Sequence, residues 1–134
     1  MSPTSRSIDA ITLFTEDLAA SRAFYAKVFG AAVIYEDDNS AAFQFDHTII
    51  NLLAVAAAPD LINPRAVGRR EDGARAQFTV GVEDVDAECA RLHELGVSLL
   101  NDPMDRPWGI RTASFLDPSG HVWEFAHDLP SETA

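Results

Sequence analysis

One glutamate in the C-terminal part of the chain has the position that binding or catalysis requires. The segment HVWEF, residues 121–125, places Glu124 in a run of strand-like residues. Side chains of a strand alternate between its two faces, so Glu124 faces away from Trp123 and Phe125, which we expect in the core. On a solvated face, Glu124 would form no more than an ordinary ion pair. On the inside of a concave sheet, its carboxylate can bind a metal ion or a ligand, or act as a general base.

The histidines and the single cysteine add little metal-binding or nucleophilic chemistry. We interpret each histidine as a surface or packing residue: His47 in a tight turn, His93 on a helix, His121 at the start of the last strand, and His127 on the strand face opposite the glutamate. Cys89 falls on the apolar stripe of a helix and has no partner for an internal disulfide, so we interpret it as a small core residue. No Ser/His/Asp set, phosphate-binding glycine loop or Cys/His pair indicates another mechanism.

A repeat in the chain determines which elements position these residues. Residues 8–34 and 75–100 each run from an alternating strand through Glu-Asp and a helix to a glycine. The aspartates, Asp17 and Asp84, are the expected N-caps of the helices, and Gly30 and Gly96 lie where a left-handed residue ends a helix. Three strand candidates follow each helix: residues 32–35, 41–45 and 48–53 in the first copy, and residues 97–100, 110–116 and 122–126 in the second. The repeated unit is therefore βαβββ.

The turn Asp117-Pro118-Ser119-Gly120 joins the last two strands and has the residue preferences of a type I turn. A chain of 134 residues with 47% hydrophobic content suits one structural domain. We expect a first module over residues 1–57, an exposed and mobile linker over 58–74, and a second module over 75–134. The predicted fold class is α+β, with two βαβββ modules that form a half-open barrel around a shared cavity.

Charge and hydropathy exclude several classes of partner. The formal charge is −11, from 10 basic and 21 acidic residues. A field of that sign repels nucleic acid and anionic membranes and concentrates cationic ligands, although it also serves solubility. The longest strongly apolar stretch, residues 48–59, is shorter than a membrane-spanning helix, and the N-terminus lacks the apolar run of a signal peptide. We therefore expect a cytoplasmic protein that binds neither nucleic acid nor membrane.

Three segments together resemble a known family. DLAASRAFYAKVFGAAV, VEDVDAECARLHELGV and RPWGIRTASFLDPSGHVWEF are similar to the vicinal oxygen chelate superfamily, which includes glyoxalase I, extradiol dioxygenases, and fosfomycin- and bleomycin-resistance proteins. The resemblance covers residues 8–128 and implies a glyoxalase-like fold and a homodimer. In metal-using members, each module gives one ligand from its first strand and one from its last. These positions correspond here to Ala10, Asn51, Gln77 and Glu124.

This set of four is incomplete for a metal ion. Alanine cannot ligate, and the amides of Asn51 and Gln77 are weaker ligands than the His and carboxylate groups that hold zinc, nickel or iron. A shift of the alignment by one or two residues replaces Ala10 with Asp9 or Thr12 and still completes no set. We expect no metal or other cofactor, and leave open a weakly held divalent metal that substrate oxygens help to bind.

The resemblance and the incomplete set together favour a metal-free, antibiotic-sequestering protein of the bleomycin-resistance type. Its ligand would be a hydrophobic or cationic small molecule, and the expected contacts are Phe14, Phe43, Asn51, Gln77, Trp108 and Glu124. In the alternative interpretation of the aromatic residues, Phe14 and Phe43 belong to the core and Trp108 covers a sheet edge. The alternative function is a lyase, isomerase or dioxygenase that uses Glu124 as base or metal ligand. A purely structural module is disfavoured because the predicted fold encloses a cavity.

Overall fold

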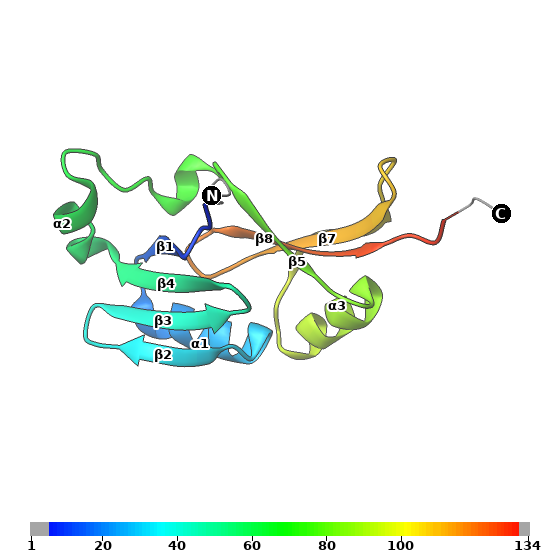
Figure 1. Ribbon diagram of the computed structural model, residues 1–134, viewed down its shortest axis with the longest axis horizontal. Helices are drawn as coiled ribbons and strands as arrows, with labels where there is room; N and C mark the ends of the chain where they lie inside the picture. The colour runs from blue at the N-terminus through cyan, green and yellow to red at the C-terminus, as the bar shows by residue number, and fades with distance from the viewer. Residues whose placement is uncertain (1–5, 132–134) are drawn as a thin grey trace, which may run out of the picture. The chain divides into compact units, whose positions relative to one another are not determined.

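The computed structural model describes residues 6–131, which form two compact units that meet in the chain between Gly68 and Arg69 (Figure 1). The first unit contains β1 (Ala10–Thr15), α1 (Leu18–Phe29), β2 (Ala32–Glu36), β3 (Ser40–Phe45), β4 (Thr48–Ala54), η1 (Val55–Ala57) and α2 (Pro59–Ile62). The second contains η2 (Arg70–Asp72), β5 (Gln77–Gly81), α3 (Val85–Glu94), β6 (Leu99–Asp105), β7 (Ile110–Leu116) and β8 (Val122–Asp128). Both predicted βαβββ modules and the α+β class are confirmed.

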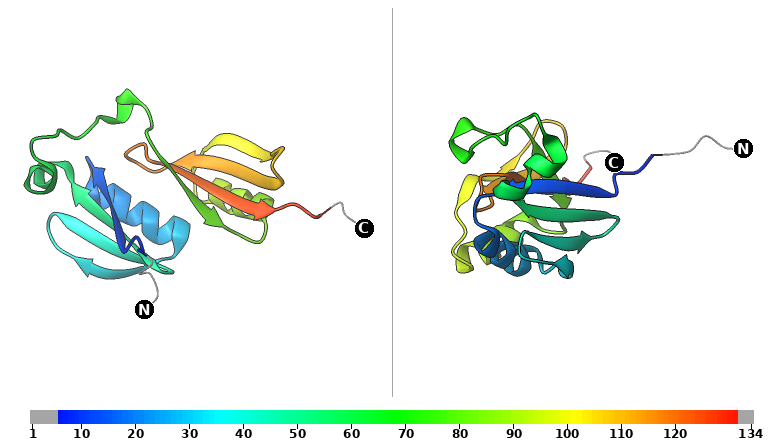
Figure 2. Two further views of the ribbon diagram at one scale, coloured as in Figure 1. Left: turned by 45° about the horizontal axis from the view of Figure 1, so that its top comes forward. Right: turned by 90° about the vertical axis from the view of Figure 1, so that its left-hand side faces the viewer.

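Each unit is built on one four-stranded sheet with the same topology. The strand orders are β1-β4-β3-β2 and β5-β8-β7-β6, and in each sheet the first strand pairs in parallel with the last. Helix α1 packs against β3 and β4, and α3 packs against β6, β7 and β8, so that each helix covers one face of its own sheet (Figure 2). Since the first and last strands of a module are neighbours, residues far apart in the sequence lie side by side, with β1 and β5 at one edge of their sheets.

The helix boundaries follow the predicted capping residues. The carboxylates of Asp17 and Asp84 accept hydrogen bonds from the third amide of α1 at 3.0 Å and of α3 at 3.1 Å. These bonds satisfy amides that have no partner within the helix. Gly30 and Gly96 follow the helices with φ of 61° and 79°, a region that residues with a β-carbon rarely adopt. The caps and the helix-ending glycines are confirmed.

The hydrophobic core of each unit lies between its helix and its sheet. In the first unit, Tyr25 of α1 and Phe43 of β3 are fully buried, with ring centroids 5.8 Å apart. In the second, Trp123 and Phe125 of β8 are buried, as predicted, together with Phe115 of β7. The expected core position of Cys89 is also confirmed, and burial raises the pKa of its thiol. Among residues 6–131, no helix is long and apolar enough to cross a membrane.

The turn between β7 and β8 has the predicted hydrogen bond, from the amide of Gly120 to the carbonyl of Asp117 at 3.0 Å. The buried Asp117 carboxylate accepts two further amide hydrogen bonds, from Ser119 and His121. Arg70 of η2 also contacts this turn, because its Nε donates to the carbonyl of Pro118 at 3.2 Å. The start of the second unit is thereby attached to its last hairpin.

One expectation about local structure was wrong. The strand predicted over residues 97–100 instead spans Leu99–Asp105, because Pro103 is tolerated in an edge strand, where its missing N–H has no ladder partner, and the pairing with β7 is irregular. The predicted linker, residues 58–74, is exposed over most of its length, as expected, and also contains helical structure in α2 and η2. Ala58, at its start, is fully buried.

Candidate functional site

Glu124 of β8 lies beside a threonine of β5, the edge strand of the second sheet. In the parallel pairing of β5 with β8, its neighbour is Thr79, whose hydroxyl donates a hydrogen bond to Glu124 Oε1 at 2.8 Å. The glutamate side is opposite the face that α3 covers, because neighbouring residues of a strand alternate. We define the Glu124 face by the residues that share this side in β5, β8 and β7: Gln77, Thr79, Gly81, Val122, Glu124, Ala126, Asp128, Ile110, Thr112, Ser114 and Leu116.

The first unit repeats this arrangement with a neutral residue. Asn51 of β4 lies beside Thr12 of β1, and the two side chains are 3.5 Å apart, from Nδ2 to Oγ1. This distance is at the upper limit for a hydrogen bond, so the contact is weaker than that of Glu124 with Thr79. We define the Asn51 face by the residues that share this side in β1, β4 and β3: Ala10, Thr12, Phe14, Ile49, Asn51, Leu53, Ser40, Ala42 and Gln44.

The strand register places threonines, and not the predicted Ala10 and Gln77, directly beside Asn51 and Glu124. Ala10 pairs with Ile49 and Gln77 pairs with Val122, so both predicted site residues lie on the expected faces but two residues before the threonines. Thr12 and Thr79 were missed as site residues. Aligning each first strand with its last strand in parallel could have indicated them, because Thr12 and Thr79 occupy the same place in the repeat.

The three aromatic candidates have different surroundings. Phe14 is half-buried on the Asn51 face, opposite Leu53. Phe43 has no exposed surface and packs against Tyr25, so its predicted role as a ligand contact is corrected: it belongs to the core. Trp108 is 68% exposed in the loop between β6 and β7. Of the three, Phe14 and Trp108 remain available to a ligand.

The side chains on the Glu124 face and the Asn51 face do not provide the ligands that a divalent metal ion in this fold would need. On the Glu124 face the only acidic side chains are Glu124 and Asp128, and the Asn51 face has neither acidic residues nor histidine. Within residues 6–131, no three His, Cys, Asp or Glu side chains are grouped as metal ligands. Zinc, nickel and iron require several histidine, thiolate or carboxylate ligands. The strong donors on these faces are therefore two carboxylates, those of Glu124 and Asp128, which are fewer than such an ion requires.

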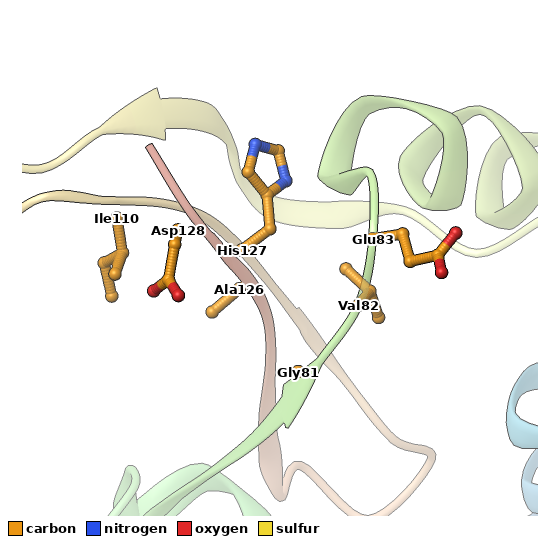
Figure 3. Close-up of a pocket in the computed structure, with 7 residues that line it drawn as sticks. All are labelled: Gly81, Val82, Glu83, Ile110, Ala126, His127 and Asp128. Carbon is orange, nitrogen blue, oxygen red and sulfur yellow. The ribbon is translucent and has the colours of Figure 1, made fainter. Parts of the chain in front are cut away.

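His127 has a structural role that accounts for its position. Its Nδ1 accepts a hydrogen bond from the amide of Val85, the first residue of α3, at 2.9 Å. Figure 3 shows its ring directed away from Ala126 and toward the helix. The predicted position of His127, on the face opposite Glu124, is confirmed.

A pocket opens at one end of the Glu124 face. Its volume is about 450 Å³, and it lies within the second unit (Figure 3). Gly81, Ala126, Ile110 and Asp128 belong to the Glu124 face, and Val82, Glu83 and His127 complete the lining. Ala126 is two residues beyond Glu124 in β8, so the pocket continues the surface that carries the glutamate. Small and apolar side chains with a few polar groups are typical of ligand sites.

The sequence and the fold have relatives among known proteins. A model of the glyoxalase/bleomycin resistance protein/dioxygenase superfamily matches residues 7–125. The chain belongs to this superfamily. The predicted resemblance is thereby confirmed.

Two proteins and one solved structure illustrate the range of this superfamily. Over 119 residues, the chain is 31% identical to the uncharacterized protein YraH of Bacillus subtilis, a match that covers 85% of this chain and 92% of YraH. Over 122 residues, it is 28% identical to the metallothiol transferase FosB of Lysinibacillus sphaericus, covering 91% of this chain and 82% of FosB. A glyoxalase/bleomycin resistance protein/dioxygenase from Nocardioides has a TM-score of 0.83 at 24% identity, covering 99% of this chain and 93% of that structure. The last likeness shows the glyoxalase-like fold.

Proposed function

We propose that this chain is a metal-independent member of the superfamily that binds and sequesters a hydrophobic, cationic small molecule, of the kind found among antibiotics. The observation that carries the proposal is the donor set of the second unit, where Glu124 lies beside Thr79. Such a set orients a ligand through one charge and one hydroxyl group. It lacks the ligands for a catalytic metal ion.

The surroundings of Glu124 support a cationic ligand group. The hydroxyl of Thr79 donates a hydrogen bond to Glu124 Oε1. Within residues 69–131, no arginine or histidine forms an ion pair with the Glu124 carboxylate. Glu124 is half-buried, which strengthens an ion pair relative to one in bulk water. The net charge of −11 favours the approach of a cation. Trp108, an exposed residue of the same unit as Glu124, is the aromatic contact that we propose for the apolar part of the ligand, and the homodimer stays the expected assembly.

Elemental analysis and ligand binding test the proposal together. Protein purified without an affinity tag or chelator should contain no stoichiometric iron, zinc, nickel or manganese. In a thermal-shift screen against aromatic cationic antibiotics, at least one compound should raise the Tm, since a ligand that binds only the folded state stabilises it. Glu124→Gln should weaken the binding of that compound about tenfold, which corresponds to about 1.4 kcal/mol of binding free energy. Glu94→Gln is the matched control, because it makes the same change at an exposed glutamate of α3, outside the Glu124 face and the pocket.

Two results would contradict the proposal. One divalent metal ion per chain that is lost in Glu124→Ala would show that the glutamate is a metal ligand. Equal affinity of wild type and Glu124→Gln for every compound that binds would remove the glutamate from the ligand site.

An enzymatic function is the second candidate, because FosB, a relative that the chain matches over 91% of its length, is a transferase by name. In this alternative Glu124 is a general base, and Thr79 holds the carboxylate in place through Oε1. Steady turnover of a defined substrate that Glu124→Gln abolishes would favour the enzyme over the sequestering protein. Thr79→Val should then reduce the rate less than Glu124→Gln does, because Thr79 only positions the base.

A further inference from the structure

An arginine on the Glu124 face is held by neutral groups. Arg106 follows β6 and is half-buried. Its Nε donates to the hydroxyl of Thr112 at 2.9 Å, and its Nη1 donates to the thioether sulfur of Met104 at 3.1 Å. Since Thr112 belongs to the Glu124 face and Met104 pairs with it, the guanidinium lies on that side of the sheet.

The other half-buried arginines of the second unit are paired differently. Arg91 forms an ion pair with Glu88 at 2.8 Å, and Arg111 forms two, with Asp86 and Asp105, each at 2.8 Å. Within residues 69–131, Arg106 has no such carboxylate partner. The chain has 21 acidic residues, so a lack of carboxylates does not explain this difference.

A half-buried guanidinium without an anion is electrostatically incomplete. Removal of a charge from water is costly unless a counter-charge or hydrogen bonds compensate it. Thr112 and Met104 use only part of the five N–H donors of the guanidinium, whose planar fork matches the two oxygens of a carboxylate or a phosphonate. Arg106 is therefore prepared to bind an oxyanion from outside the chain.

The position of Arg106 relative to Glu124 defines the size of such a ligand. Ser114 of β7 pairs with Glu124, and Thr112, which holds Arg106, pairs with Ala126 two residues further along β8. Thr112 thus has two acidic diagonal neighbours, Glu124 and Asp128, and diagonal positions in an antiparallel pair lie about 7–8 Å apart. The guanidinium that Thr112 holds is therefore near enough to Glu124 for one small molecule to contact both.

We propose that Arg106 binds the oxyanion of a small, zwitterionic ligand whose cationic end contacts Glu124. The contact at Glu124 rests on the proposed function, whereas the oxyanion site rests on Arg106 and its own neighbours. The oxyanion is a carboxylate or a phosphonate group. The ligand is accordingly an amino acid-like or aminophosphonate-like compound with an apolar body between its charges.

Four simple probes separate these charges on one six-carbon chain: caproate, hexylphosphonate, hexylamine and ε-aminocaproate. Each is titrated into the intact ¹⁵N-labelled protein while the arginine Nε–H resonances are followed by NMR. Arg106→Lys assigns the Arg106 signal by its disappearance. Arg106→Gln removes the charge, and Arg75→Gln is the matched control, because it makes the same change at an exposed arginine of the same unit.

We expect the Arg106 Nε–H signal to shift with caproate or hexylphosphonate, and the stronger of the two identifies the oxyanion. Arg106→Gln should weaken the binding of that anion at least about tenfold, as expected for loss of a charge-assisted hydrogen bond. Arg75→Gln should bind as wild type does. ε-Aminocaproate should bind more tightly than caproate, and Glu124→Gln should remove this advantage.

Absence of any shift of the Arg106 signal with either anion would overturn the proposal, as would equal anion affinity of Arg106→Gln and wild type. If Arg106→Gln fails to fold, the wild-type NMR titration still decides the matter, with the Arg106 signal assigned by Arg106→Lys. If anions bind through Arg106 but Glu124→Gln changes neither ε-aminocaproate nor hexylamine binding, the oxyanion site holds and the proposed role of Glu124 fails. If hexylamine binding depends on Glu124 and anions do not bind, the proposed function holds and the oxyanion site fails.

Discussion

The hydrogen bond between Thr79 and Glu124 provides a direct test of the strand register that builds the site. Thr79→Val removes the hydroxyl and keeps the shape and the strand preference of the side chain. Thr12→Val makes the same change at the corresponding place of the first unit. The donor–acceptor distances differ, at 2.8 Å for Thr79 with Glu124 and 3.5 Å for Thr12 with Asn51. The two substitutions should therefore have different effects on stability.

The expected magnitude follows from the length and exposure of each contact. A hydrogen bond to a charged group contributes about 1.5–3 kcal/mol when well formed. Because Thr79 is exposed and its carboxylate partner is half-buried, we reduce this to about 0.5–1 kcal/mol for Thr79→Val. Thr12→Val should lower the free energy of unfolding by less than about 0.5 kcal/mol, since its contact is at the distance limit and involves a neutral amide.

The chain carries its own probe of the second unit. Both tryptophans, Trp108 and Trp123, lie there, and Trp123 is only 3% exposed, so its fluorescence reports unfolding of the sheet that holds Glu124. Urea unfolding followed by tryptophan fluorescence measures Thr79→Val, Glu124→Met and the double variant, and circular dichroism measures Thr12→Val. The double-mutant cycle isolates the pairwise energy, which should be at least about 0.5 kcal/mol.

Two outcomes would refute this reasoning. A coupling energy near zero would show that the hydrogen bond does not hold Glu124 in place. A loss of stability in Thr12→Val equal to that in Thr79→Val would show that hydroxyl removal alone, and not the contact with the carboxylate, determines the effect.

Three further predictions concern stability. A hydrogen bond from Arg111 lowers the pKa of Asp86 below its usual value of 3.8. The stability that this interaction contributes is therefore present above that pH and is lost as the pH falls through the lowered pKa. In urea unfolding between about pH 3 and 5, Asp86→Asn should lose less free energy of unfolding on acidification than wild type does. His127→Ala should lower the free energy of unfolding by about 1 kcal/mol, and His127→Asn by less, because its amide oxygen can accept the same helix amide; equal losses in both would contradict the capping role. Phe43→Ala should lower the free energy of unfolding by about 3–5 kcal/mol, whereas Trp108→Ala should change it by less than about 0.5 kcal/mol in the same urea assay. Comparable losses in the two variants would contradict the assignment of Phe43 to the core.

The sequence by itself determined the local structure of both modules. The N-caps at Asp17 and Asp84, the left-handed glycines and the turn at Asp117 each depend on hydrogen bonds or backbone angles within a few residues. Short-range preferences of this kind are visible in one sequence. The repeat of these signals also determined the βαβββ order, and the resemblance of three segments to the superfamily indicated the family.

The neighbours of the site residues were decided only by the tertiary structure. Thr79 and Glu124 are 45 positions apart, and their contact depends on the register with which β5 joins β8. A shift of two residues keeps every side chain on its face, so periodicity alone does not separate Gln77 from Thr79 as the neighbour of the carboxylate. The burial of Phe43 likewise depends on the tertiary structure, because Tyr25 of α1 packs against it. Local preferences fix which face a side chain occupies, whereas pairing between distant strands fixes what it contacts there.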